Sequence, residues 1–182
     1  MIKVLVPIAE GTEEMEAVII IDMLRRADIL VYVASDSETV KCSRGVNIKP
    51  DISFEQIQED EFDAIILPGG LTGTDNLTKN QNLISILKKH QIRNKMIGAI
   101  CAAPKILIQN NILEKGTSIT SHPSIEGMLK GYNYLNNDVV VSNNIISSRG
   151  AGTAFKFALK IISLLVSNKK ADEIKKSIIL TD

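Results

Sequence analysis

The feature that most constrains this chain is a set of four short apolar runs, at residues 2–9, 29–34, 63–68 and 96–100. Each run is almost continuously apolar, which is typical of strands that are buried on both faces. Helix-type patterns separate the runs, and strands joined by helices form parallel sheets whose faces the helices cover. The sequence therefore predicts an α/β fold, an open and mostly parallel sheet with helices on both faces.

The helix after the first run has an acidic start. Thr12 is expected to cap it with its hydroxyl, and Glu13, Glu14 and Glu16 occupy its first turns, where carboxylates suit the positive end of the helix dipole. The helical pattern continues to Arg26. Taken singly, each of these glutamates is most simply explained as an exposed residue at the start of a helix.

Later segments carry further patterns. The apolar spacing predicts a helix over residues 80–90, and we expect His90, at its lysine-rich end, to lie at the surface. A hairpin or small side sheet is expected over residues 40–48 and a hairpin over residues 139–148. A long helix is expected to follow Thr153.

The composition excludes several classes of protein. A length of 182 residues fits one domain, residues 1–182. Lysine plus arginine and aspartate plus glutamate both number 21, so the net charge of zero gives no reason to expect nucleic acid or an anionic membrane as a partner. Two cysteines and two histidines, far apart, show no metal-ligand spacing. Because there is no signal peptide, membrane-spanning run or disulfide framework, the sequence predicts a cytoplasmic protein.

Cys101 stands where the fourth apolar run turns into a helix-like segment. Small residues around it let a strand and a helix approach closely: Gly98, Ala99, Ala102 and Ala103. Such an elbow lifts one side chain out of the sheet edge in a strained backbone conformation. The amides that follow lie at a helix N-terminus, which favours a thiolate and a developing oxyanion. The alternative is a core cysteine, since unpaired cysteines are among the most buried residues.

Other polar residues follow the ends of buried runs. Ligands bind beyond the carboxyl ends of parallel strands, so we expect these groups to meet at one edge of the sheet. Glu16 can exchange a proton with the Cys101 sulfur if burial raises its pKa. The pair Gly69 and Gly70 allows close backbone approach and can supply a backbone N–H to an oxyanion. His122 is a candidate base. The plainer alternatives are a strand-ending turn for the glycines and a polar loop residue for the histidine.

Two arginines and the second cysteine complete the candidate set. Arg26 and Arg44 can form an anion pocket at the mouth of the site, although an arginine that ends a helix most often serves only the helix dipole. Cys42 is interpreted as structural.

Taken together, these segments resemble the ThiJ/PfpI family, and its Parkinson-disease deglycase branch closely. The motifs run in order along nearly the whole chain: AEGTEEME at residues 9–16, LRR at 24–26, CSRG at 42–45, LPGG at 67–70, AICAAP at 99–104, SHP at 121–123 and SRGAGT at 148–153. Most of them are unspecific alone, but the joint match is highly specific.

The resemblance implies a flavodoxin-like α/β fold, a homodimer, and no metal or organic cofactor. It makes Cys101 the reactive cysteine and Glu16 the protonated carboxyl that hydrogen-bonds it. It also places the amides of Gly70 and Ala102 at the oxyanion site and His122 near the cysteine. Finally, it implies that the two arginines named above border the same pocket.

The implied function is that of a cofactor-independent glyoxalase or protein deglycase, acting on methylglyoxal-type α-oxoaldehydes and on glycated protein side chains. The Cys101 thiolate attacks the aldehyde carbon, and Glu16, with His122, moves protons through an ene-diol before water releases lactate. An alternative is a redox sensor or chaperone that uses oxidation of the same cysteine. A third, a cysteine peptidase or amidase, requires an aligned Cys-His pair with an acidic partner, and none is obvious here.

Overall fold

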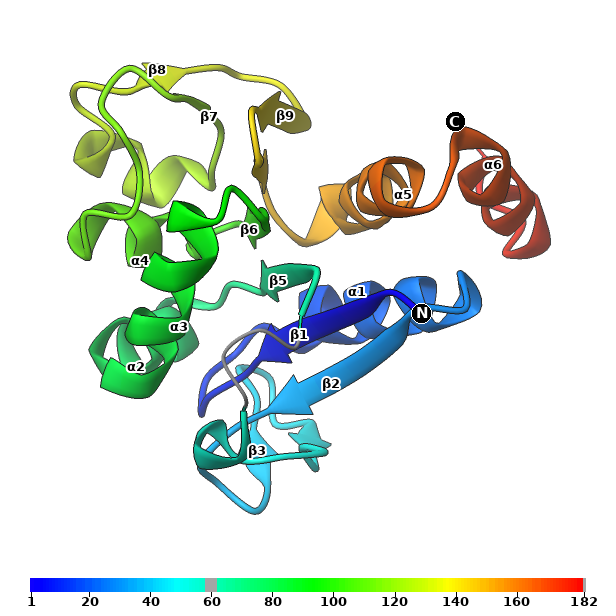
Figure 1. Ribbon diagram of the computed structural model, residues 1–182, viewed down its shortest axis with the longest axis horizontal. Helices are drawn as coiled ribbons and strands as arrows, with labels where there is room; N and C mark the ends of the chain where they lie inside the picture. Colours follow the sequence, from blue (N-terminus) through cyan, green and yellow to red (C-terminus); the bar gives the residue numbers. More distant parts are fainter. Residues whose placement is uncertain (58–61, 182) are drawn as a thin grey trace.

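A six-stranded sheet runs through the centre of the molecule in the order β2-β1-β5-β6-β10-β9 (Figure 1). The computed structural model describes residues 1–57 and 62–181. Neighbouring strands are parallel except for β9, which pairs antiparallel with β10 at one edge. The strands are β1 (Lys3–Pro7), β2 (Leu30–Ala34), β5 (Ala64–Leu67), β6 (Met96–Ile100), β9 (Val139–Ser142) and β10 (Ile145–Ser148). The predicted open, mostly parallel sheet is confirmed, and the fold is flavodoxin-like.

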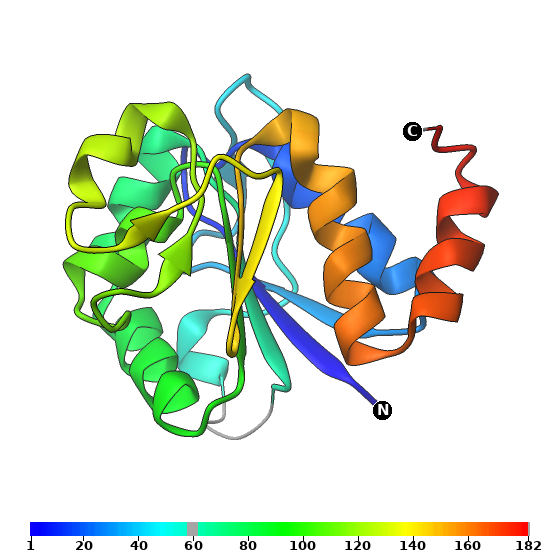
Figure 2. The ribbon, with the colours of Figure 1, turned by 90° about the horizontal axis from the view of Figure 1, so that it is seen from above.

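Helices cover both faces of this sheet, which Figure 2 shows edge-on. Three of them lie on one face: α1 (Glu14–Arg26), α5 (Ala154–Leu165) and α6 (Asn168–Ser177). The others lie on the opposite face: α2 (Leu71–Lys79), α3 (Gln81–Ile92) and α4 (Pro104–Gln109). The predicted covering of both faces is therefore confirmed.

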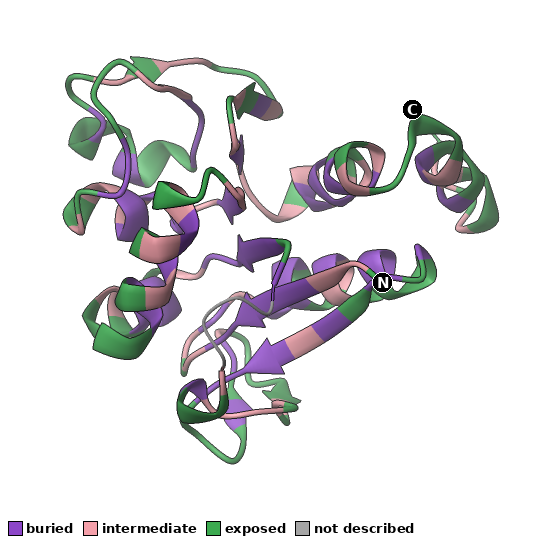
Figure 3. Ribbon diagram, viewed as in Figure 1, coloured by how far each residue is buried: buried purple, intermediate pink, exposed green. Residues whose placement is uncertain are grey.

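The apolar runs are continuous because each strand contributes to two cores. Val4 and Val6 of β1 pack into the cluster beneath α1 and α5, whereas Leu5 packs into the cluster beneath α3 and α4. The inner strands are accordingly buried along their length (Figure 3). Because alternate residues are buried in opposite directions, both faces of an inner strand such as β5 are apolar.

The two expected hairpins are present. β3 (Val40–Lys41) pairs antiparallel with β4 (Asn47–Ile48), and β9 with β10. A further small sheet joins β7 (Ser118–Ile119) to β8 (Asn133–Tyr134). The helix expected from residue 80 is α3, which Asn80 caps by accepting a hydrogen bond from the Leu83 amide at 2.9 Å.

α2 was not predicted from the sequence pattern, and its composition explains why. Its nine residues, LTGTDNLTK, include Gly73 and only two leucines, so they carry no recognisable apolar stripe. The helix packs instead through close backbone approach, since a Cβ on Gly73 would lie 2.5 Å from the Thr12 backbone nitrogen.

Two local predictions are wrong. Thr12 does not cap α1: its hydroxyl is buried and accepts the Ala9 amide at 3.0 Å, and the capping position is held by Glu13 without a side-chain bond. His90 is not at the surface: it lies on the inner side of α3 and is buried.

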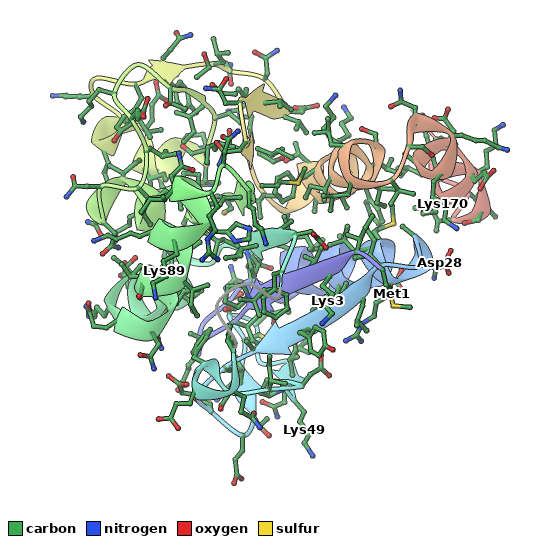
Figure 4. All side chains as sticks on the ribbon, viewed as in Figure 1. Met1, Lys3, Asp28, Lys49, Lys89 and Lys170 are labelled. Atoms are coloured by element: carbon green, nitrogen blue, oxygen red, sulfur yellow. The ribbon has the colours of Figure 1, made fainter. Side chains whose placement is uncertain are left out.

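The last helix is attached to the end of the first. Lys170 of α6 pairs with Asp28, just beyond α1, at 2.6 Å, and Figure 4 labels both side chains.

Within the described residues, no helix is both long enough and apolar enough to cross a membrane.

Candidate active site

The carboxyl ends of three neighbouring strands, β1, β5 and β6, converge on one cavity of about 590 Å³. Five of the predicted site residues line it: Cys101, Gly70, Ala102, His122 and Arg44. The convergence expected from chain direction is therefore correct, and the strand order now explains it, because β1, β5 and β6 are consecutive in the sheet.

Cys101 occupies a strained elbow between β6 and α4. Its φ of 63° lies in the left-handed region, which costs a residue with a side chain about 1–3 kcal/mol. Neighbouring segments hold it there: its N–H donates to the Ser148 carbonyl and its carbonyl accepts the His122 amide, both at 2.9 Å. The half-buried thiol is thereby directed out of the sheet edge into the cavity.

Glu16 is fully buried beside this thiol. Its Oε2 accepts the Gly69 amide at 2.7 Å, and its Oε1 is buried without a partner in the described part of the chain. Burial raises the pKa of the carboxyl to about 7, although the bonds to Gly69 and Cys101 oppose the shift. At neutral pH this carboxyl is thus close to half-protonated, as a proton carrier requires.

Gly69 must be a glycine for the two groups to meet. A Cβ at this position would lie 2.7 Å from both the Cys101 Cβ and the Glu16 Oε2. The amide of Gly69 is not available to an oxyanion, because it is already bonded to the carboxyl. The amides of Gly70 and Ala102 instead hydrogen-bond the Cys101 sulfur, which is the placement expected for an oxyanion site.

The amide that follows the elbow favours the thiolate, as predicted, but burial and Glu16 outweigh it. Burial raises the pKa of the Cys101 thiol, and the Glu16 carboxylate raises it further, to about 12; the amides of Gly70 and Ala102 lower it but do not compensate. Two buried acids this close cannot both ionise at neutral pH. A thiolate therefore requires Glu16 to keep its proton, and the pair functions as a unit with one negative charge.

Two buried groups are expected to contribute to stability with opposite pH dependence. The Glu16 pKa is raised from 4.5 to about 7, so its stabilising contribution is full below pH 4.5 and is lost as pH rises through 7. Burial and then Lys95 lower the His90 pKa from 6.5 to about 4, so its contribution is present above pH 6.5 and is lost as pH falls through 4. In the native protein, the opposite effects of Glu16 and His90 on the free energy of unfolding cancel between pH 4.5 and pH 6.5.

Glu16→Gln should remove the pH dependence of stability that is due to Glu16 and leave the one that is due to His90. We expect the free energy of unfolding of this variant to rise with pH, relative to wild type, by about 1.4 kcal/mol per pH unit between pH 4.5 and 6.5. Urea denaturation at a series of pH values measures this, with the exposed Glu55→Gln as the control. Parallel pH curves for wild type and Glu16→Gln would contradict the raised pKa.

His122 lines the cavity, but its ring is not arranged as a base for the thiol. Its Nδ1 accepts the Ser124 amide at 3.2 Å and lies 2.8 Å from the Ser124 hydroxyl. Both recorded partners belong to Ser124, so within the described residues no carboxylate orients the ring. The aligned Cys-His-acid arrangement that a peptidase needs is missing from this part of the chain.

The two arginines have different places. Arg44 lines the cavity, and its backbone is held by Glu14, whose Oε1 accepts the Arg44 amide at 2.7 Å and whose Oε2 accepts the Ser43 hydroxyl at 2.7 Å. Burial opposes ionisation of Glu14, but these hydrogen bonds outweigh it and lower its pKa. The sequence analysis missed this role of Glu14.

Arg26 does not line the cavity of its own chain, so its place at the pocket remains a prediction. Arg26 ends the 13-residue α1 and pairs with Asp22 at 2.6 Å. At about 1.5 Å of rise per residue it lies roughly 18 Å from the start of the helix, where Glu14 and Glu16 lie.

Cys42 is buried, although it too lines the cavity. Within the described residues, no cluster of three or more His, Cys, Asp or Glu side chains could hold a metal ion.

The fold and the site define a flavodoxin-like α/β protein with a cysteine at a strained strand-to-helix elbow and a buried glutamate beside it. Residues 2–164 match the model of the DJ-1/PfpI family. The chain belongs to this family, so the resemblance noted from the motifs is confirmed.

Relatives span almost the whole chain. Protein dj-1beta of Drosophila melanogaster is 42% identical over 180 residues, covering 97% of this chain and 96% of the relative; the crystal structure of Drosophila melanogaster DJ-1beta superposes with a TM-score of 0.95, covering 100% of this chain and 99% of that one. The glutathione-independent glyoxalase DJR-1.2 of Caenorhabditis elegans is 36% identical, covering 94% and 92%. The structure named Toxoplasma gondii DJ-1, oxidized, is 36% identical with a TM-score of 0.95, covering all of both chains.

Proposed function

We propose that this protein is a cofactor-independent glyoxalase and protein deglycase that acts on methylglyoxal-type α-oxoaldehydes and their adducts. The observation that carries the proposal is the pair of Cys101 and Glu16: a thiol on an elbow, open to a cavity, beside a carboxyl whose pKa of about 7 suits proton transfer at neutral pH. The relative named as a glutathione-independent glyoxalase supports it. Membership of the DJ-1/PfpI family is consistent with enzymatic activity.

The first step forms a bond between sulfur and the aldehyde carbon. Glu16 holds its proton while Cys101 is a thiolate; the sulfur attacks, the carbonyl electron pair moves to oxygen, and Glu16 protonates that oxygen to complete a hemithioacetal. The amides of Gly70 and Ala102, which already point at the sulfur, stabilise the negative oxygen before it is protonated.

Glu16 then acts as a base. It removes the hydrogen from the former aldehyde carbon as a proton, which gives an enediolate with its charge on the former ketone oxygen. The hydroxyl proton of the former aldehyde oxygen passes to that oxygen, and Glu16 returns its proton to the neighbouring carbon, which gives a lactoyl thioester on Cys101. Water hydrolyses the thioester, releases lactate and restores the thiol. Glycated side chains enter the same route when the sulfur takes the carbonyl fragment from a hemithioacetal or an aminocarbinol.

Lactate formation tests this proposal. Purified, reduced protein is incubated with methylglyoxal in the absence of glutathione, and lactate is followed by a coupled enzyme assay. Protein-dependent lactate is the expected result; its absence from active-site-titrated, reduced protein would rule the proposal out.

We also propose that the active form is a homodimer. Met15 and Val18 on the outer side of α1 and Val46 in the neighbouring hairpin are about half exposed, at 55%, 49% and 48%. The backbone N–H of Val46 donates to Glu14 at the start of α1, at 3.4 Å, and Arg44, two residues before Val46, lines the cavity. Analytical ultracentrifugation should give the dimer mass, and Val18→Asp should shift it to the monomer; a monomeric wild type would contradict the proposal.

A second candidate function uses the same cysteine as a redox sensor or redox-regulated chaperone. The relative whose structure is named as oxidized favours it. One peroxide would convert the thiolate to a sulfenic acid and a second to a sulfinic acid, each releasing water. Intact-mass analysis after mild peroxide tests it: a gain of two oxygens confined to Cys101, without lactate formation, supports sensing over catalysis.

A further inference from the structure

The hydroxyl of Ser43 lies between two carboxylates and has one hydrogen to share. Its Oγ is 2.8 Å from the Oε2 of Glu13 and 2.7 Å from the Oε2 of Glu14. An ionised carboxylate accepts hydrogen bonds and donates none, and a hydroxyl donates one. When both carboxylates are charged, Ser43 can therefore satisfy only one of them at a time.

The hydrogen is needed most by Glu14. This carboxylate is buried, and its Oε1 already accepts the amides of Arg44 at 2.7 Å and of Val46 at 3.4 Å. A buried charge requires such partners. Glu13, in contrast, is half-buried and holds the capping position of α1 without a side-chain bond to that helix. Within the described residues, the shared Ser43 hydroxyl is the partner recorded for its carboxylate, which leaves Glu13 able to accept a donor from a ligand.

The Glu13 carboxylate lies in the cavity of the reactive thiol. Glu13, Ser43 and Cys101 all line this cavity. Burial is the first cause that raises the pKa values of Glu16 and Cys42, and the charge of Glu13 adds to both. Because this effect falls with distance, the Glu13 carboxylate must lie near both groups. It is therefore close to the place where the sulfur attacks.

We propose that Glu13 is a specificity-determining residue, whose carboxylate binds a cationic nitrogen attached to the carbon that Cys101 attacks. The inference rests on the proposed function and deepens it, because it names amine adducts, such as the aminocarbinol of a lysine side chain, as preferred over neutral adducts. The cavity of about 590 Å³ lies in the range of roughly 300–1,000 Å³ that accepts drug-sized ligands, so it has room for such a side chain beside the three-carbon fragment. As the bond from sulfur to carbon forms, the carbon–nitrogen bond breaks, its electron pair stays on nitrogen, and the protonated adduct leaves as a neutral amine.

Two cations line the same cavity and oppose the binding of a positive ligand. Lys41 and Arg44 are both exposed, whereas Glu13 is half-buried. Water and salt screen exposed charges more strongly than partly buried ones. We therefore expect the charge of Glu13 to outweigh these two cations near the sulfur.

Charged thiol reagents test the proposal without any turnover. In a Cys42→Ala background, Cys101 is the single thiol of the chain. Its rate of reaction is measured with three methanethiosulfonates: the neutral methyl, the cationic 2-aminoethyl and the anionic 2-sulfonatoethyl compounds. Each rate is divided by that of a small free thiol, so that the intrinsic reactivity of the reagent cancels. We expect Cys101 to prefer the cationic to the neutral reagent by about fivefold, and Glu13→Gln to abolish this preference.

Glu10→Gln is the matched control, since Glu10 lines the same cavity but is exposed. It removes the same charge, and we expect it to change the cationic preference by less than about twofold. The amide of Glu13→Gln can donate to the Ser43 oxygen, so we expect its thermal unfolding temperature not to fall. If Glu13 only supported the fold, the neutral and cationic rates would change together.

Three results would overturn the proposal: a cationic preference unchanged in Glu13→Gln, an equal loss of preference in Glu13→Gln and Glu10→Gln, or a wild type that prefers the anionic reagent. The lactate assay judges the proposed function separately. Absence of lactate together with a cationic preference that depends on Glu13 would overturn the proposed function and support the binding of a cation at Glu13.

Discussion

Cys101→Ala is expected to abolish the conversion of methylglyoxal to lactate and to leave the fold intact. The proposed reaction forms and breaks a bond to this sulfur, and no neighbouring group described here can replace it. Loss of a covalent nucleophile typically lowers kcat by at least about 10³-fold. The fold should survive because alanine occupies the same left-handed backbone with one atom fewer, so thermal unfolding should shift by no more than a few degrees.

Cys42→Ala is the matched control. Cys42 lines the same cavity, but it is buried, and burial followed by the charges of Glu14 and Glu13 raises its pKa to about 11. We expect this variant to retain most of the wild-type turnover. Equal losses in both variants, or more than a tenth of wild-type activity in Cys101→Ala, would contradict the assignment of the nucleophile.

Glu16→Gln should separate ionisation of the thiol from turnover. Glutamine can still accept the Gly69 amide, but it carries no negative charge and can donate an N–H to the sulfur. One of the causes that raise the pKa of Cys101 is then removed, so that pKa should fall. Lactate formation should nevertheless fall by at least about 100-fold, since an amide cannot carry a proton between carbons.

The rate of alkylation of Cys101 by iodoacetamide at pH 7 reports the change in its pKa, and the lactate assay reports the change in turnover. We expect faster alkylation of Cys101 and slower turnover in Glu16→Gln, and slow values for both in Glu16→Leu, which has neither charge nor donor. Cys101 alkylation that is slower in the glutamine variant than in wild type would show that the Glu16 charge does not oppose the thiolate.

The parallel sheet could be predicted because its signal is local. Burial on both faces makes a strand such as β1 continuously apolar, and nothing distant is needed to see it. α2 could not be predicted because its support is distant: Gly73 lies against the backbone of Thr12, and α4 covers the helix. Thr12 was misassigned for a local reason: its hydroxyl accepts the amide of Ala9, in the turn before the helix, and not an amide of the helix.

The sequence predicted those parts of the site that follow from the direction of the strands. It did not predict those parts that depend on which distant residues pack together. Glu16 lies on the buried stripe of α1 with Ile20 and Leu24, a periodicity visible in the sequence. What makes a carboxyl tolerable there is the Gly69 amide, 53 residues away in sequence, and this pairing has no local signal. The pKa of Cys101 likewise depends on burial and on Glu16, neither of which the sequence around the cysteine shows. Helix length, in contrast, is enough to show that Arg26 lies far from Glu16 along α1 within one chain.

The most direct test of the account is to follow ¹³C-labelled methylglyoxal by NMR with reduced protein in D₂O, without glutathione, for wild type and Cys101→Ala. The account predicts lactate signals that grow only with wild type, and deuterium at the second carbon of the lactate, because Glu16 exchanges its proton with solvent during transfer. Methylglyoxal hydrate that persists with wild type, or lactate formed equally by Cys101→Ala, would contradict it.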